Sequence, residues 1–425
     1  MRIGHIVIDP TPLRESRDFR WLYTGAILQS AGSKVTLTGA NWQVYALTHS
    51  PLAVGLLSLT TCIGGLVSQL TGGMLADRHD RRMILLATGL PQALLAGGLV
   101  ANSRLEHPAL WAIFVIMLMI GMLAGIGSPA STAAVPALVG QSRLPAAAAL
   151  NGLGNQLGSL VGPALAGLLI AGPGLGACYG ASAACCTAFS LALLFVRPLP
   201  PAVRAQPPGL GSLAEGVRYV RHSGVIGGML LVDTNAMLFG MPAGLFPAIA
   251  SQHFHGGSVT FGLIAAAPGL GAILGAASSG WTGRVRRPGI VVIVAGIAWG
   301  LAIVAFGLAP SLPVAMVFLA LAGMADMISE ILRNTLLQIY APDELRGRLS
   351  GLYLAQVSTA PALGNTEAGI VAQLFSVTTS VVSGGLACVA GALLLGALIP
   401  ALRNATLDGP VREDITAPAI PETAD

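Results

Sequence analysis

Charged side chains are scarce in this chain: only 9% of its 425 residues are Asp, Glu, Lys or Arg, and Lys34 is the one lysine. Hydrophobic residues make up 54% of the chain, and the mean hydropathy is +0.75. One folded core cannot hide so much apolar surface, and so few charges cannot keep it in water. The scarcity of charge therefore excludes a soluble monomeric protein and predicts an integral membrane protein.

Motifs for enzymatic chemistry are missing as well. The chain has no Walker-type phosphate loop, no Ser/His/Asp set and no paired carboxylates in a soluble segment. Its formal net charge of +4 comes from arginines spread over many short links, which excludes the basic patch of a nucleic-acid-binding protein. We expect no enzyme, no cofactor and no nucleic-acid partner. No apolar run precedes a cleavage site before Phe19, so no signal peptide is predicted.

Cysteine is rare, and its five residues all lie in apolar segments: Cys62, Cys178, Cys185, Cys186 and Cys388. None has the spacing of a zinc site with histidines, so we interpret them as small core residues. His253 and His255 are close in sequence, but two histidines without further ligands indicate a plain loop. No metal site is predicted.

Apolar segments of membrane length are abundant. A bilayer core of about 30 Å needs about 20 apolar residues of helix, and twelve segments fit. They are residues 20–47, 53–76, 83–102, 109–136, 147–171, 176–196, 224–249, 260–281, 289–309, 312–338, 350–375 and 378–401. With both termini in the cytoplasm, only Arg104 falls in an outer loop and only Arg333 within a span, an asymmetry that the positive-inside rule favours.

The predicted fold is an all-α membrane protein with twelve transmembrane helices in two six-helix bundles. The predicted parts are a cytoplasmic N-terminal segment 1–18, an N-terminal bundle 19–196, a cytoplasmic central loop 197–223, a C-terminal bundle 224–401 and a cytoplasmic tail 402–425. Gly280–Arg287 takes the place between spans eight and nine that Gly72–Arg82 takes between spans two and three. Such a repeat indicates two bundles that rock about a central site.

The most informative short segment is the basic turn Gly72–Arg82, which has the form Gly-x-x-x-Asp-Arg-x-x-Arg-Arg from Gly73 onward. Two spans joined by so short a link are expected to be antiparallel neighbours, and the arginines hold the link on the cytoplasmic side. An aspartate where one helix ends and arginines where the next begins would form a charged latch between helix ends.

Twelve spans, the six-plus-six division and this turn together resemble the major facilitator superfamily over almost the whole chain. The details are most similar to enterobactin (siderophore) exporters and related bacterial drug exporters. The matching stretches are Thr48–Ser50, Gly72–Arg78, Val135–Gly140, Phe246–Ala250, Arg287–Gly289 and Arg346–Arg348, followed by Gly351, Leu352, Ala355 and Gln356.

The resemblance implies that the turn is a cytoplasmic gating element whose residues here are Gly73, Asp77, Arg78, Arg81 and Arg82. It implies that Asp77 and Arg81 pair with neighbouring helix ends when the inner gate is closed. Asp80 stands where a glycine is usual before the paired basic residues. The alternative is a generic basic loop on the inner side.

Span five resembles the glycine-proline motif of the superfamily's proton-coupled exporters, with Ala166 where a second glycine is common. The matching residues are Gly158, Gly162, Pro163 and Gly167. Glycines four residues apart let helices touch backbone to backbone, and the proline removes one backbone donor and bends the span. The same spacing also fits ordinary helix packing.

Six ionisable residues fall inside spans: Lys34 in span one, Asp233 in span seven, Asp326, Glu330 and Arg333 in span ten, and Glu367 in span eleven. Each costs roughly 2.5–3.5 kcal/mol at the middle of a span, so they are expected to face one another or water. The resemblance implies that spans one, four, seven and ten line the central cavity. Span four carries no charge and lacks the arginine of many proton-coupled drug exporters.

On span ten, Asp326 and Glu330 are four residues apart on one face, and Glu330 and Arg333 are three apart and near enough to pair. Two carboxylates beside one guanidinium in a poorly hydrated bundle cannot both ionise cheaply. We predict that Asp326 takes up the coupling proton, with Asp233 as the second candidate. The alternative is a structural set of salt bridges that pins the two bundles together.

Lys34 is expected either to meet an anionic substrate or to partner Glu367. The sequence thus predicts a multi-pass, monomeric secondary active exporter of the bacterial inner membrane that works by alternating access, a proton entering as a small molecule leaves. The favoured substrate is a siderophore or a similar secreted molecule. One alternative is a multidrug or antibiotic exporter, because a cavity with both charge signs, glycine and methionine also suits amphiphilic drugs. Another is a transport-dead sensor or scaffold on the same fold.

Overall fold

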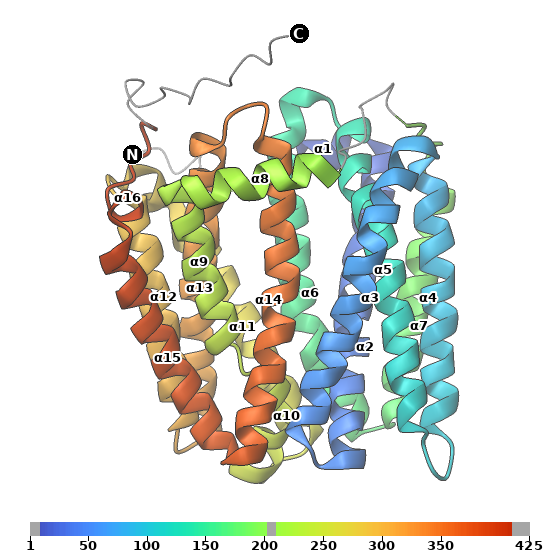
Figure 1. Cartoon of the computed structure of the whole chain (residues 1–425). Coiled ribbons are helices and arrows are strands. Elements are labelled where there is room, and N and C mark those ends of the chain that lie inside the picture. The colour runs from blue at the N-terminus through green and yellow to red at the C-terminus, as the bar shows by residue number, and fades with distance from the viewer. Residues whose placement is uncertain (1–8, 202–209, 410–425) are drawn as a thin grey trace.

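A computed structural model describes residues 9–201 and 210–409 as an all-helical protein (Figure 1). The longer helices are α2 (Arg17–Thr48), α3 (Pro51–Arg78), α4 (Arg81–Ser103), α5 (Leu110–Leu138), α6 (Leu144–Ala171), α7 (Leu175–Leu194), α8 (Leu210–His222), α9 (Gly224–Phe239), α11 (Ser258–Ser278), α12 (Pro288–Gly307), α13 (Leu312–Tyr340), α14 (Arg346–Leu374) and α15 (Val377–Leu398). The short ones are α1 (Thr11–Glu15), α10 (Phe246–Ala248) and α16 (Pro400–Arg403). The predicted segments 1–18, 197–223 and 402–425 lie partly outside the described residues.

Membrane-spanning helices dominate the fold. Within the described residues, ten helical segments are long and apolar enough to cross a bilayer. The helices α2 and α14 are also of membrane length, but they are not among the ten because they carry more polar side chains. The prediction of an all-α membrane protein is therefore confirmed, while the count of twelve spans stays a prediction.

The helix boundaries follow from local capping. The hydroxyl of Ser50 accepts a hydrogen bond from the Ala53 backbone at 3.4 Å, and Pro51 occupies the first helical position of α3. The Ser376 hydroxyl caps α15 in the same way, at 3.0 Å from the Thr379 nitrogen. At the end of α2, His49 adopts a left-handed backbone with φ of 50°, which stops this helix one residue before Ser50, the N-cap of α3. The hairpin between α2 and α3 is thus encoded locally.

Span seven was predicted as one helix over 224–249, and this is wrong in detail. The α9 helix ends at Phe239, and a break precedes α10 and a π-helical turn that runs to His253. Pro242 and Pro247 lack a backbone donor, which favours the interruption. The freed groups have partners, because the Trp299 indole donates to the Gly240 carbonyl at 2.7 Å and the Gly244 nitrogen to the Asn365 side chain at 2.8 Å.

Helices α2 to α7 pack mainly on one another, and α9 to α15 do the same, so two sets of helices lie side by side (Figure 1). The pairs α3 with α14 and α6 with α11 join the two sets closely. Within the first set, α3 and α4 are connected by two residues, but α3 packs mainly against α5, and α4 packs against α7 and α5. The expectation that they are direct neighbours is corrected, because α5 lies against both.

The contacts between the two sets depend on glycine. A methyl group placed on Gly369 of α14 would lie 2.8 Å from the Leu52 Cα atom of α3. One placed on Gly167 of α6 would lie 2.6 Å from the Ser258 carbonyl oxygen of α11. Tyr45 adds a polar contact, since its hydroxyl accepts from the Gln252 amide at 2.8 Å. All these contacts lie toward the end of the molecule where α3 begins and α14 ends.

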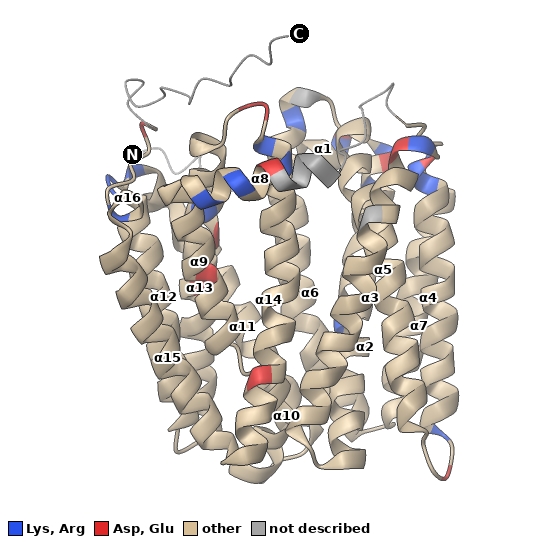
Figure 2. Cartoon of the chain, in the orientation of Figure 1, with Lys and Arg blue, Asp and Glu red and all other residues tan. Residues whose placement is uncertain are grey.

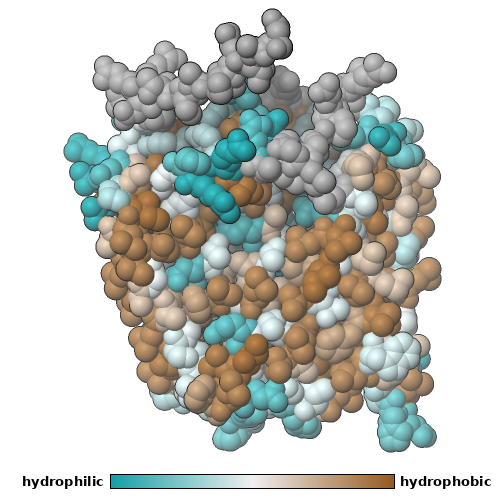
Figure 3. Space-filling model, viewed as in Figure 1, coloured by the Kyte–Doolittle hydropathy of each residue, from teal (hydrophilic) through white to brown (hydrophobic). Residues whose placement is uncertain are grey.

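Positive charge gathers at the opposite end, where α8 lies across the ends of the long helices (Figure 2). Arg104 is the C-cap of α4, at the opposite end of that helix from Arg81 and Arg82, and its place on the outer side stays a prediction. The surface between the two ends is largely hydrophobic (Figure 3). Such a band between two polar rims is what a bilayer requires.

Candidate functional site

A buried ion pair joins α9 and α13. The Arg333 guanidinium contacts the carboxylate of Asp233, and the two side chains are 5% and 0% exposed. Gln356 of α14 donates its amide to the second Asp233 oxygen at 2.8 Å. Arg333 also reaches Asp326 at 3.4 Å, two turns back on its own helix. Asp233 of α9 is therefore held by Arg333 of α13 on one oxygen and by Gln356 of α14 on the other, and it joins these three helices of the second set.

This geometry corrects the predicted pairing of Glu330 with Arg333. In the described residues, Arg333 forms ion pairs with Asp233 and Asp326 only. Arg333 turns toward α9, whereas Glu330 lines the neighbouring cavity. Sequence spacing showed which partners were within reach along one helix, but the preferred partner came from another helix.

Exposure separates the two candidate proton acceptors. The Asp326 side chain is 32% exposed and lines the central cavity, whereas Asp233 is fully buried and is not part of that cavity's wall. A void of about 10 Å³, room for about one water, lies between Asp233, Asp326 and Arg333. Asp326 is therefore accessible from the central cavity, whereas Asp233 borders only the small void behind Asp326 and Arg333.

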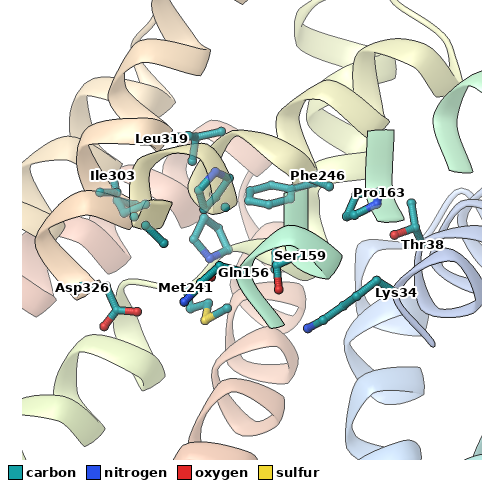
Figure 4. Close-up of a pocket in the computed structure, with 18 of the residues that line it drawn as sticks. Lys34, Thr38, Gln156, Ser159, Pro163, Met241, Phe246, Ile303, Leu319 and Asp326 are labelled. Carbon is teal, nitrogen blue, oxygen red and sulfur yellow. The ribbon is translucent and has the colours of Figure 1, made fainter. Parts of the chain in front are cut away.

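The central cavity has a volume of about 280 Å³ and lies where the two sets of helices meet. Its polar lining comes from Lys34, Thr38, Asn41, Gln156, Ser159, Asp326 and Glu330, and its apolar lining includes Met241, Phe246, Phe261, Trp299 and Met327. Lys34 and Asp326 reach toward it from opposite sides (Figure 4). It can accept a largely apolar molecule that carries polar or charged groups at its ends.

Lys34 on α2 is the only cation that lines this cavity. In the described residues it forms no ion pair, and Glu367 is not part of the cavity wall. The predicted alternative partnership of Lys34 with Glu367 is therefore absent from this structure. With Lys34, Asp326 and Glu330 all ionised, the cavity wall has one positive and two negative charges.

The span-five motif builds the wall beside Lys34. A methyl group on Gly162 would lie 2.5 Å from the Lys34 Cβ atom, and one on Gly158 would lie 2.5 Å from the Ser30 hydroxyl. Gly167 faces α11 instead, and its carbonyl accepts from Ser258 at 3.1 Å. Pro163 lines the cavity itself. The motif thus places α6 against α2 and α11 at once.

The basic turn holds helix ends through backbone carbonyls. Arg81 donates to the Ala133 carbonyl near the end of α5 at 3.0 Å, and Arg82 donates to the Leu193 carbonyl at the end of α7 at 2.9 Å. Cations at these positions suit the negative end of a helix dipole. Arg81 thus contacts a neighbouring helix end within its own set of helices, and its pairing on closure of the inner gate stays a prediction.

The charged latch involves a different aspartate from the one predicted. Asp77 and Arg78 are exposed, and in the described residues Asp77 forms no ion pair or hydrogen bond through its side chain. Asp80 instead caps α4, accepting from the Arg82 nitrogen at 2.8 Å and from the Leu199 nitrogen at 3.1 Å. The space around Gly73 is open, whereas Gly72 touches α5.

Asp80→Ala is expected to lower the free energy of unfolding by about 1–2 kcal/mol, because it removes an N-cap and leaves the Leu199 nitrogen without this acceptor. Asp77→Asn should change it by less than about 0.5 kcal/mol, as at other exposed positions. Thermal unfolding of both variants in detergent measures the difference. Equal losses of stability would contradict the assignment of the latch to Asp80.

Sequence reasoning missed several cavity residues. Thr38 and Asn41 follow Lys34 at spacings of four and seven, a helical signal that was available. The aromatic residues Phe246, Phe261 and Trp299 gave no such signal, since aromatic side chains in apolar helices resemble ordinary core. Span four, implied as a wall, contributes no residue, and α6, α11 and α12 take its place.

The cysteines and His253 lie in structural environments. Cys178, Cys186 and Cys388 are buried, the other two cysteines are partly buried, and all are free thiols. His253 contacts the Ala309 carbonyl at 2.9 Å through its ring, which gives it a structural role. In the described ranges, no group of three or more potential metal ligands occurs.

Comparison with known proteins gives one matching family, described as transmembrane secretion effector, over residues 10–420. The enterobactin exporter EntS of Citrobacter koseri is 35% identical over 369 residues, covering 87% of this chain and 88% of that protein. The enterobactin exporter EntS of Escherichia coli is 34% identical over 358 residues, covering 84% and 85% respectively.

Solved structures share the fold at low identity. A D-xylose–proton symporter aligns with a TM-score of 0.72 at 14% identity, covering 91% of this chain and 98% of that one. A bacterial homologue of the iron transporter ferroportin, in an inward-facing state, aligns with a TM-score of 0.67 at 17% identity, covering 92% and 99%. These likenesses concern the arrangement of helices alone.

Proposed function

We infer the function of this chain from one premise: it belongs to the transmembrane secretion effector family of the major facilitator superfamily. It is therefore a multi-pass membrane transporter that exports a small molecule, and it is not an enzyme. We place it in the bacterial inner membrane with twelve spans, in which α2 and α14 complete the ten apolar helices. Both termini then lie with the arginines in the cytoplasm.

We propose transport by alternating access, in which the bundles 19–196 and 224–401 rock about the central cavity. Support comes from the glycine contacts between α3 and α14 and between α6 and α11, which lie toward the arginine-poor end. They would close the outer side in this state. Gly73, Asp77, Arg78, Arg81 and Arg82 would form the inner gating element, since Arg81 and Arg82 hold the ends of α5 and α7.

We propose that Asp326 carries the coupling proton. It lines the cavity, it is partly exposed, and it shares Arg333 with Asp233. Because Asp233 already balances the arginine, the cavity carboxylates Asp326 and Glu330 face a single lysine across the site. Protonation of Asp326 would make the cavity wall neutral overall, which favours reorientation of an empty site through the membrane.

The favoured substrate is a siderophore or a similar secreted small molecule with an anionic group. The observation that carries this proposal is the lone lysine of the chain lining an otherwise largely apolar cavity. The enterobactin exporters to which the chain is similar point to the same class. A cavity of about 280 Å³ is at the small end for ligand sites. A second cavity of about 520 Å³ lies between α2, α5 and α6 and shares no lining residue with the central one, so a large siderophore would need the two to join during transport.

Multidrug export is the alternative. The aromatic and methionine side chains of the cavity would suit an amphiphilic cation that binds to Asp326 or Glu330.

Counterflow in liposomes containing the purified protein tests these substrates. We expect labelled enterobactin-type siderophore to exchange against unlabelled siderophore, while a lipophilic cationic drug does not compete. Exchange of the drug without exchange of the siderophore would establish the alternative. Failure of both in the intact protein would contradict export of either class.

Lys34→Ala is expected to weaken siderophore exchange at least about tenfold in apparent affinity, because a hydrogen bond to a charged group contributes about 1.5–3 kcal/mol. Thr38→Ala, one turn away in the same cavity wall, is the matched control and should change it less than about threefold. The measurement is the concentration dependence of exchange. If both variants weakened every substrate alike, Lys34 would not select the substrate.

A further inference from the structure

A groove of about 630 Å³ lies on the side of the second set of helices, separate from the central cavity. Its walls come from α8, α9 and α14 and from the residue after α15. The apolar lining includes Val217, Val220, Leu230, Leu231, Leu352 and Ile399. No residue is shared with the central cavity, so the proposed substrate site does not account for this groove.

Glycines at the start of α9 line the groove. They are Gly224, Gly227 and Gly228, and they let α9 pack closely against the neighbouring segments, since a methyl group on Gly224 would lie 2.7 Å from the Ala401 Cβ atom. A methyl group on Gly227 would lie 2.6 Å from the Val220 carbonyl oxygen, so only glycine lets α9 begin so close beneath α8. Ser223 makes the sharp connection by capping α9 at the Ile226 nitrogen.

The α8 helix is firmly attached above the groove. Glu215 forms an ion pair with Arg348 of α14, and the Tyr219 hydroxyl donates to the Tyr340 carbonyl at 3.1 Å. Partial burial raises the pKa of the Tyr219 phenol, which keeps it a donor. The roof of the groove is therefore a fixed part of the second set of helices.

The arginines at the edge of the groove and the aliphatic walls below them indicate which kind of molecule the groove could bind. Arg221 is exposed at the α8 edge of the groove, with Arg218 one turn earlier, and neither forms an ion pair within the described residues. Below them the walls are aliphatic, and Leu231 is 52% exposed on the membrane-facing side. On this face, hydrophilic residues at the arginine-rich end border the hydrophobic band (Figure 3). An anionic head above a hydrocarbon chain matches this order.

We propose that the groove binds one anionic phospholipid, with its phosphate at Arg221 and one acyl chain between α9 and α14. A free phosphate would leave the apolar walls uncovered, and a peptide would find no backbone partners among aliphatic side chains. The acyl chain of the lipid would pass over Gln356, whose side-chain amide donates a hydrogen bond to Asp233 at 2.8 Å. The lipid would thus cover the side of the buried Asp233–Arg333 pair that lies nearest the bilayer.

Native mass spectrometry of the full chain in detergent tests the proposal, with phosphatidylglycerol and phosphatidylcholine of the same acyl chains as probes. We expect one phosphatidylglycerol to be retained with an apparent affinity roughly fivefold higher than that of phosphatidylcholine. Arg221→Gln should abolish the preference, and Arg221→Lys should keep it. Arg286→Gln, an exposed arginine outside the groove, is the matched control and should also keep it.

Filling the groove gives a second readout that does not depend on charge. Thr234→Phe places a ring where the acyl chain would lie, so both lipids should lose the retained binding event while the protein elutes as a single species in gel filtration. Equal retention of the two lipids by the wild type, or an unchanged preference in Arg221→Gln, would overturn the proposal. Displacement of the lipid by glycerol phosphate alone would instead indicate a site for free phosphate and would also overturn it.

Discussion

Asp326→Asn is expected to abolish substrate accumulation driven by a pH gradient. A gradient of one pH unit supplies about 1.4 kcal/mol per proton, so a transporter coupled to one proton accumulates its substrate about tenfold. Asparagine keeps the shape and polarity of the side chain but cannot exchange a proton. The accumulation ratio in liposomes should therefore fall to about one, while counterflow without a gradient persists.

The structure places the carboxylates of Asp326 and Asp233 in different environments, so the effects of substituting them can be distinguished. Asp326 is 32% exposed and lines the cavity, and Asp233 is enclosed by Arg333 and Gln356. Glu330→Gln is the matched control, since Glu330 lines the same cavity one turn away without an ion pair to Arg333. Accumulation retained by Asp326→Asn and lost by Glu330→Gln would move the proton to Glu330. Accumulation retained by both would contradict a proton carrier in this cavity.

Arg333→Leu is expected to produce the largest loss of stability, about 3–5 kcal/mol, because it leaves the fully buried Asp233 carboxylate without a countercharge. The measurements are thermal unfolding in detergent and the amount of protein in the membrane fraction. Adding Asp233→Asn to Arg333→Leu should recover most of the loss, since no charge then remains buried in this pair.

An exposed ion pair provides the comparison. Arg348 and Glu215 have side chains that are 34% and 56% exposed, so Arg348→Gln should cost less than about 1 kcal/mol. If Arg333→Leu were as mild as Arg348→Gln, the buried pair would not be compensating Asp233. If the Asp233→Asn addition failed to restore stability, the cost would come from lost packing of the arginine.

Much of the fold could be predicted because membrane insertion depends on local composition. Leu110–Leu138 and Pro288–Gly307 are recognisable from hydropathy alone, since about 20 apolar residues suffice to define a span. Span seven was predicted less well. Its break after Phe239 is stabilised by Trp299 and Asn365, which lie far away in sequence. Within the segment 224–249 itself, the prolines were the only local signal for a break.

The candidate site also has a part that the sequence predicted and a part that it did not. Charges within spans were visible in the sequence because a bilayer tolerates few of them, and Lys34, Asp326 and Glu330 do line one cavity. Their pairing was predicted wrongly where the sequence offered only neighbours on one helix, as for Glu330 and Arg333. The latch shows the same limit, since Asp80 acts through Leu199, more than a hundred residues away.

By itself, the sequence determined that this protein lives in a bilayer, where its helices run and which charged residues must avoid lipid. These properties follow from the transfer of each segment from water to hydrocarbon, which depends on that segment alone. Only the tertiary structure decided that Arg333 belongs to Asp233, that Lys34 faces Asp326 across a cavity, and that a separate groove opens under α8. Those relations depend on how closely helices approach, and that distance is set by glycine contacts between elements far apart in the chain.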